Sequence, residues 1–173
     1  MSFVSSIIVV ENIARSRMLY ETILHLKVSA DFGIYNVGFE GGLSLYGKAF
    51  FQELIGSQVN LDKHNNVVLY FEVDELEELA EEITQHGFEF IHGIKEQPWK
   101  QRNFRFYDYD QHILEIAEKM DVVIFRLQQT GNSIEEIAKL TGYSADQVVQ
   151  ELEKYKETGY SLNDKEHPNK ASV

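Results

Sequence analysis

The sequence predicts an α+β fold in which two βαβββ modules form a cupped mixed sheet, followed by a C-terminal extension of helix-turn-helix type. The main observation is an internal repeat, because a strand, helix, strands succession starts near Phe3 and again near Asn66. After Glu118 the hydrophobic period becomes helical. A βαβββ module leaves one sheet face uncovered, so we expect two modules, from one chain or from two, to meet around a shared concave space.

The composition narrows the class of protein. The chain has 173 residues and 43% hydrophobic residues, which favours one domain with an appendage. The absence of cysteine excludes disulfides and thiolate metal sites. The net charge of -12 disfavours a phosphate backbone as partner. The N-terminus lacks a signal-peptide pattern and no apolar run reaches the roughly 18 residues of a membrane span, so we expect a cytoplasmic protein with no membrane partner.

The first module covers about residues 3–48. Its opening strand, 3–10, is almost continuously apolar, which predicts a central strand covered on both faces. Asn12 is a good N-cap for a helix that ends near His25. The expected strands follow at roughly 27–32, 34–40 and 43–48. Residues 49–66 are interpreted as a connection between the modules.

The second module covers about residues 67–117. It opens with a strand at 67–73, has Asp74 as the expected N-cap of a helix and has Gly87 as a C′ residue. Strands are predicted near 88–96, 102–107 and 112–117, with a turn between the last two.

The extension at 119–158 is predicted to be helical, and 159–173 is polar and predicted to be a flexible tail. Ser133 with Glu136 forms a capping box. The pattern resembles a helix-turn-helix, but the would-be reading helix is acidic, with Asp146, Glu151, Glu153 and Glu157. Nucleic acid is therefore not the expected partner, and packing on the sheet or on a dimer contact is favoured.

Two motifs carry a family resemblance over about residues 3–117, within an expected domain at 1–118. VENIARS at 10–16 and WKQRNFRFYDYDQHILEI at 99–116 are similar to the opening and closing motifs of the vicinal oxygen chelate superfamily, which includes glyoxalase I, bleomycin resistance proteins, fosfomycin-modifying enzymes and extradiol dioxygenases. Departures are Tyr109 for the turn proline, and Gln111 and His25 for glycines. If Gln111 requires a positive φ, it costs about 1 kcal/mol.

The resemblance implies where metal-dependent members would hold an ion. Those positions fall on Ser5, Ser44, Val68 and Glu115, of which only the glutamate is a strong ligand. The histidines outside the closing motif have no ligand spacing, and His112 has the opposite strand parity to Glu115. We therefore predict no catalytic metal and no other cofactor.

Glu115 is the candidate catalytic residue or ligand anchor, in a cup where Arg102 or Lys48 would compensate its charge. The expected ligand-binding residues share suitable strand or hairpin positions, and they are Ser5, Phe39, Ser44, Tyr46, Val68, Tyr70, Trp99, Arg102, Phe104 and Phe106.

The expected function is a metal-free, homodimeric protein that binds a small aromatic or cationic molecule. One alternative is a lyase, isomerase or dioxygenase-like enzyme that uses Glu115 as a base. The other is a DNA-binding regulator that acts through its C-terminal helices.

Overall fold

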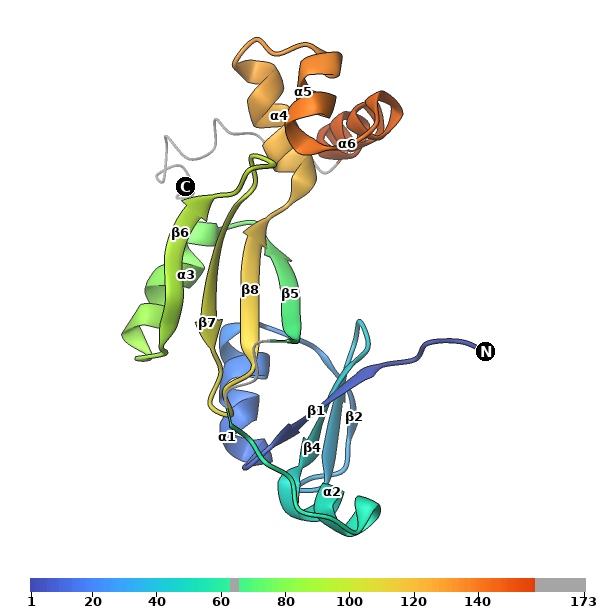
Figure 1. Ribbon diagram of the computed structural model, residues 1–173, viewed down its shortest axis with the longest axis vertical. Coiled ribbons are helices and arrows are strands. Elements are labelled where there is room, and N and C mark those ends of the chain that lie inside the picture. The colour runs from blue at the N-terminus through green and yellow to red at the C-terminus, as the bar shows by residue number, and fades with distance from the viewer. Residues whose placement is uncertain (63–65, 158–173) are drawn as a thin grey trace, which may run out of the picture. The chain divides into compact units, whose positions relative to one another are not determined.

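The computed structural model describes residues 1–62 and 66–157 (Figure 1). These residues form two compact units: the first contains 1–95 and 103–117, and the second contains 96–102 and the residues from 118 onward. The predicted tail at 159–173, together with His64 and His167, lies outside the described residues.

The first module of unit one forms a four-stranded mixed sheet. Its strands are β1 (Ser6–Val10), β2 (Val28–Asp31), β3 (Asn36–Phe39) and β4 (Leu43–Gly47), in the order β1-β4-β3-β2. β1 is parallel to β4, while β3 is antiparallel to both of its neighbours. The prediction of a central first strand was wrong, since β1 lies at an edge. Its apolar run reflects two different faces: Ile8 is buried in the core, whereas Ile7 is 47% exposed.

The first helix begins as predicted and then changes its winding. The Asn12 side chain accepts a hydrogen bond from the Arg15 backbone N–H at 3.0 Å, which confirms the N-cap. Helix α1 (Ile13–Arg17) continues as the π-helical η1 (Met18–Ile23), and His25 follows at φ 53°. The connection after β4 contains a helix that the sequence reasoning missed, α2 (Lys48–Ile55), which ends at the left-handed Gly56.

The second module repeats the layout and confirms the predicted βαβββ pattern. Its strands are β5 (Val68–Val73), β6 (Phe90–Glu96), β7 (Arg102–Tyr107) and β8 (Ile113–Glu118), in the order β5-β8-β7-β6. Helix α3 (Leu76–Gln85) starts after Glu75, so the N-cap is one residue later than the predicted Asp74. Gly87 takes φ 73° behind this helix, as expected of a C′ residue.

One face of each sheet packs into a shared core. Leu76 and Ile83 of α3 belong to one hydrophobic cluster with buried residues of the strands, among them Phe104, Phe106 and Leu114. Strand β5 contributes Leu69, Phe71 and Val73 to the border of this core. Because side chains alternate along a strand, the intervening Val68 and Tyr70 point to the other face, where they are 44% and 49% exposed.

The β7–β8 turn ties the second module to the first helix. Tyr20 Oη donates to Asp108 Oδ2 at 2.8 Å, and Asp110 Oδ1 accepts from the Glu11 backbone N–H at 2.9 Å. Burial raises the pKa of Asp110, as does the charge of Asp108, and the Glu11 hydrogen bond opposes them. Gln111 closes the turn at φ 68°, so it does occupy the strained conformation. These contacts fix the hairpin that carries Glu115.

Up to residue 157, the second unit contains three helices with a core of their own. They are α4 (Met120–Gln129), α5 (Ile134–Thr141) and α6 (Ala145–Glu157). Both hydrogen bonds of the Ser133–Glu136 capping box are present, which confirms that prediction. Among the described residues, none of the helices combines the length and apolar character that crossing a bilayer requires.

Glu118 holds the segment 96–102 to these helices. Its carboxylate, which is 5% exposed, accepts from Arg102 Nε at 2.7 Å and from Arg126 Nη2 at 3.1 Å. Its backbone carbonyl accepts from Gln101 Nε2 at 2.7 Å. Arg126 also donates to the Lys100 carbonyl at 3.0 Å. A buried carboxylate shared by two arginines explains why the β6–β7 connection belongs to the helical unit.

Candidate ligand-binding site

The register of the last hairpin places two opposite charges side by side. β7 and β8 pair antiparallel with Arg105 opposite Glu115 and Asn103 opposite Ala117. Directly opposite residues on antiparallel strands project to the same face. We use the name Glu115 face for the side of this sheet that carries Val68, Tyr70, Glu72, Asn103, Arg105 and Glu115.

Glu115 is a buried carboxylate with three polar contacts. It is 8% exposed, and its Oε1 accepts a hydrogen bond from Asn103 Nδ2 at 2.6 Å. Its Oε2 accepts from Arg105 Nε at 2.7 Å and forms an ion pair with Arg105 Nη2 at 2.6 Å. The fork of the guanidinium therefore engages one oxygen while the amide engages the other. Each oxygen therefore accepts a hydrogen bond within the protein, and the charge of the carboxylate is compensated by Arg105.

The surroundings of this pair are polar and partly accessible. Arg105 Nη1 lies 2.9 Å from His92 Nε2, and the Arg105 side chain is 24% exposed. On the neighbouring strand β5, Tyr70 Oη donates to Glu72 Oε1 at 2.9 Å. A half-exposed aromatic ring thus shares a face with a guanidinium plane and two carboxylates. Such a face can stack against a flat ring or attract an organic cation.

The three predicted phenylalanines lie elsewhere. Phe104 and Phe106 pair with Ile116 and Leu114, so they occupy the sheet face opposite to Glu115, and both are fully buried. Phe39 is 3% exposed and contacts Tyr20 with 6.2 Å between ring centroids. The structure therefore places these three rings away from Glu115, contrary to the expectation that they line one pocket with it. Strand alternation separates residues of even and odd number, and burial of a ring in the core takes precedence over exposure to a ligand.

The predicted residues of the first module lie on the sheet that contains β1 and β4. Ser44 pairs with Ile7, and Tyr46 pairs with Val9. The Tyr46 ring lies 6.0 Å from that of Phe51 in helix α2, in an edge-on arrangement. Ser5 precedes β1 and is half-buried. Ser44 and Tyr46 therefore share a face on the first sheet, whereas Val68 and Tyr70 share the Glu115 face on the second.

The expected cations are engaged with other carboxylates. Arg102 belongs to the helical unit and pairs with Glu118. Lys48 Nζ lies 2.7 Å from Glu11 Oε2. Trp99 also belongs to the helical unit, where its Nε1 donates to Gln101 Oε1 at 2.9 Å. The cation that compensates Glu115 is Arg105, in place of the expected Arg102 or Lys48.

The residues at the metal positions of the superfamily do not fit a metal ion. Two serine hydroxyls, a valine and an ion-paired carboxylate do not supply the three or four strong donors that divalent cations require. Within residues 1–62 and 66–157, no three His, Asp or Glu side chains come together as a possible ligand set.

Sequence reasoning missed Arg105 and Asn103 as neighbours of Glu115, and His92 as a neighbour of Arg105. Arg105 could have been identified from the position of the turn in the sequence. The Asp108 backbone N–H donates to the His112 carbonyl at 3.0 Å, so these two residues close the hairpin. Counting three residues back from Asp108 and three forward from His112 reaches Arg105 and Glu115. His92 comes from another strand, and no local pattern connects it to the pair.

Paired βαβββ modules of this kind define a class of small-molecule-binding and enzymatic domains. The chain belongs to the glyoxalase-like domain family, which matches residues 3–121, and thereby to the vicinal oxygen chelate superfamily that its two motifs resemble. No curated protein matches the chain.

Three solved structures are similar to it. A protein of unknown function from Agrobacterium tumefaciens str. C58 is 36% identical, with a TM-score of 0.62 over 69% of this chain and 94% of that one. A glyoxalase-related enzyme from Fulvimarina pelagi is 17% identical, with a TM-score of 0.61 over 69% and 89%. The fosfomycin resistance protein FosX from Listeria monocytogenes is 16% identical, with a TM-score of 0.54 over 69% and 93%. The last two likenesses concern the fold alone.

Proposed function

We propose that this protein binds a small aromatic or cationic molecule on the Glu115 face, without a catalytic metal. The observation that carries the proposal is the half-exposed Tyr70 ring on the same sheet face as the fixed Glu115–Arg105 pair. The ring and the guanidinium offer two flat surfaces for stacking, and Glu72 offers a carboxylate for an attached cationic group.

The contacts of Glu115 favour binding over base catalysis. A general base must come within hydrogen-bond reach of the proton that it removes, and Glu115 is 8% exposed and ion-paired with Arg105. In this protein both Glu115 oxygens already accept hydrogen bonds from Asn103 and Arg105. The carboxylate therefore serves to orient and neutralise Arg105, and the Tyr70 ring and the Glu72 carboxylate are the groups offered to a cationic ligand.

We also propose that the ligand is enclosed by a homodimer. Val68 and Tyr70 of the second sheet and Ile7 of the first are all more than two-fifths exposed, although they occupy regular strands. Apolar side chains on sheet faces are normally covered, so a second chain that faces them would complete the cup. Light scattering coupled to size-exclusion chromatography tests this, and a monomer at micromolar concentration would rule out the enclosed site.

Calorimetric titration with two probes tests the binding proposal. 1-Methylquinolinium is an aromatic cation, and cyclohexylammonium is a cation of similar charge without a ring. We expect the aromatic cation to bind, and we expect Tyr70→Ala to weaken it about 2- to 30-fold, because stacking and cation–π contacts contribute roughly 0.5–2 kcal/mol.

Tyr35→Ala is the matched control, because Tyr35 is also a half-exposed tyrosine, at 54%, but lies outside the second sheet. Equal losses with Tyr70→Ala and Tyr35→Ala would remove the support for the Glu115 face. Stronger binding of cyclohexylammonium than of the aromatic cation would exclude stacking as the basis of recognition.

A further inference from the structure

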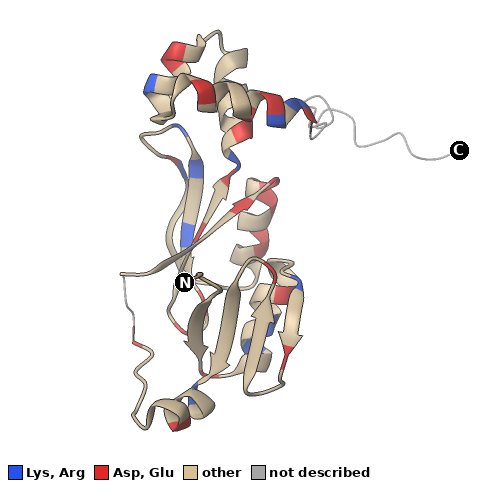
Figure 2. Cartoon of the chain, turned by 90° about the vertical axis from the view of Figure 1, so that its right-hand side faces the viewer, with Lys and Arg blue, Asp and Glu red and all other residues tan. Residues whose placement is uncertain are grey.

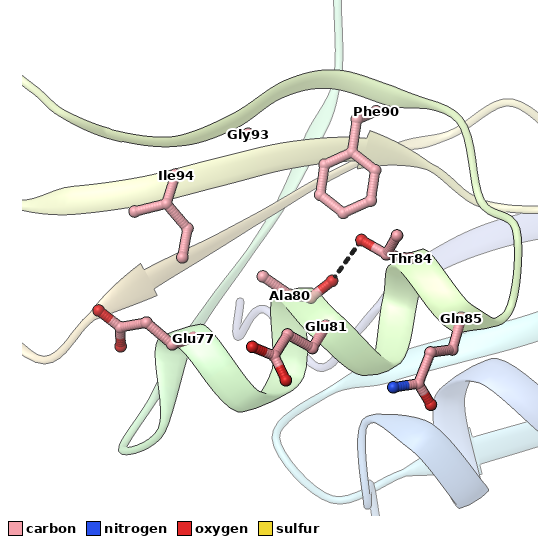
Figure 3. Close-up of a pocket in the computed structure, with 8 residues that line it drawn as sticks. All are labelled: Glu77, Ala80, Glu81, Thr84, Gln85, Phe90, Gly93 and Ile94. Atoms are coloured by element: carbon pink, nitrogen blue, oxygen red, sulfur yellow. Dashed lines mark hydrogen bonds between the residues drawn. The ribbon is translucent and has the colours of Figure 1, made fainter.

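A groove runs between helix α3 and strand β6, on the side of the second sheet away from the Glu115 face (Figure 3). Its volume is about 640 Å³, within the roughly 300–1,000 Å³ that ligand sites occupy. Phe90, Gly93 and Ile94 line it from the strand. The helix contributes Glu77, Ala80, Glu81, Thr84 and Gln85. Figure 3 shows the Phe90 and Ile94 side chains projecting from the strand toward the helix.

The strand wall of the groove is also a sheet edge. β6 is the last strand in the order β5-β8-β7-β6, so its backbone pairs with β7 on one side alone within the described residues. An unpaired edge presents N–H and C=O groups to which an extended chain can add as a further strand. Gly93 lines the groove in the middle of this strand, and a Cβ placed on it would meet no atom within 4 Å, so no other side chain covers the strand at this position.

The groove combines an apolar floor with an acidic rim. Ala80, Phe90 and Ile94 supply the apolar surface, while Glu77 and Glu81 lie one helical turn apart on α3. Thr84 already donates its hydroxyl to the Ala80 carbonyl at 2.8 Å. Acidic residues follow one another along this helix (Figure 2), and its sequence contains no lysine or arginine. The rim therefore attracts cations.

We propose that this groove binds an extended, basic peptide segment of a partner protein, which adds to β6 as a strand. Alternate side chains of an added strand face the helix. An apolar side chain would contact Phe90 and Ile94, and Arg or Lys two residues away would reach Glu77 and Glu81. Residues 90–94 span about 13 Å, at roughly 3.3 Å for each of the four steps between them, so about five peptide residues fill the groove.

The charge of the chain favours a foreign peptide over a second copy at this edge. Two copies paired through β6 would bring two acidic α3 helices close together, neither of which contains a lysine or an arginine, whereas a basic segment would find opposite charges there. The proposal is independent of the proposed small-molecule site, because the two lie on opposite faces of the sheet. A negative binding result at one site therefore does not bear on the other site.

Fluorescence anisotropy with a labelled probe peptide, Thr-Arg-Thr-Ile-Thr-Arg-Thr, tests the proposal on the full chain. This order places both arginines and the isoleucine on one face of a strand. The comparison peptide, Thr-Arg-Ile-Thr-Arg-Thr-Thr, has the same composition but divides these residues between the two faces. We expect the first peptide to bind more tightly, and its binding to weaken as salt is raised.

Two variants and a matched control locate the site. Gly93→Val places a branched side chain on a residue that lines the groove and should weaken binding about tenfold or more. Glu77→Gln with Glu81→Gln should weaken it about fivefold. Glu78→Gln removes a charge from an exposed residue of the same helix that does not line the groove, and binding should stay within about twofold.

Amide chemical-shift mapping completes the test, because it does not depend on a variant. Perturbations confined to β6 and α3 are expected. Equal affinity for the two peptides, unchanged binding by Gly93→Val, or perturbations centred on the β1 edge would each overturn the proposal. Dimerisation of the chain that Gly93→Val abolishes, with no peptide binding, would show that a second copy occupies the edge and would also overturn it.

Discussion

Replacement of Arg105 by methionine tests whether Glu115 is held in place by an ion pair. Glu115 is 8% exposed, and the guanidinium supplies two of its three contacts. Removing one partner of a buried pair costs roughly 3–5 kcal/mol. Asn103 still donates in the variant and water reaches part of the Arg105 position, which is 24% exposed, so we expect about 2–3 kcal/mol. A chain of this length should then lose about 5–10 °C in Tm.

A double-mutant cycle with Glu115→Gln isolates the pair. Both single variants and the double variant are unfolded by urea and followed by far-UV circular dichroism. We expect the double variant to lose about 1–3 kcal/mol less than the sum of the singles, because the contact can be lost only once.

Arg17→Met is the control, because Arg17 pairs with Glu21 and Asp31 in a more solvent-exposed position. Its loss should cost about 1 kcal/mol or less. An additive cycle, or equal losses for Arg105→Met and Arg17→Met, would refute the description of Glu115 as a buried carboxylate that depends on Arg105.

Three further predictions concern the turn and the second unit. Gln111→Gly should raise the free energy of unfolding by about 1 kcal/mol. The left-handed conformation costs a non-glycine residue roughly 1–2 kcal/mol, and the greater freedom of glycine in the unfolded chain offsets about half of that gain. Urea titration measures the change, and a loss of stability would contradict the strain at φ 68°. Burial lowers the pKa of His112, but the hydrogen bond and charge of Asp108 outweigh it, so the folded-state pKa lies above 6.5. This stabilisation is complete below pH 6.5 and is lost as the pH rises through the folded-state value; His112→Gln should flatten that decline in urea titrations, and an unchanged profile would contradict the assignment. Glu118→Gln should destabilise the helical unit by about 1–3 kcal/mol, because two arginines lose a charged partner. Trp99, the single tryptophan, lies in this unit, and its fluorescence should follow the unfolding of the unit. An unchanged fluorescence transition would show that Glu118 does not hold this unit together.

Local chemistry made the element boundaries predictable. Asn12 and the Ser133–Glu136 box cap helices through contacts within a few residues, so their side chains identify helix starts without knowledge of the fold. Gly87 ends α3 for the same local reason. The helix α2 was missed because it is only eight residues long and because Gly47, which precedes it, has no side chain that could mark the start of a helix.

The sequence by itself determined the repeated βαβββ layout, the closing hairpin and the position of Glu115 on the second strand of that hairpin. These follow from strand alternation, turn residues and caps, which act over a few residues. Only the tertiary structure decided that Arg105 compensates Glu115, that Phe104 and Phe106 belong to the core, and that β1 is an edge strand. The physical reason is that strand order and the choice between core and ligand-facing sides depend on pairing and burial between segments far apart in the chain, where no local propensity distinguishes the possibilities.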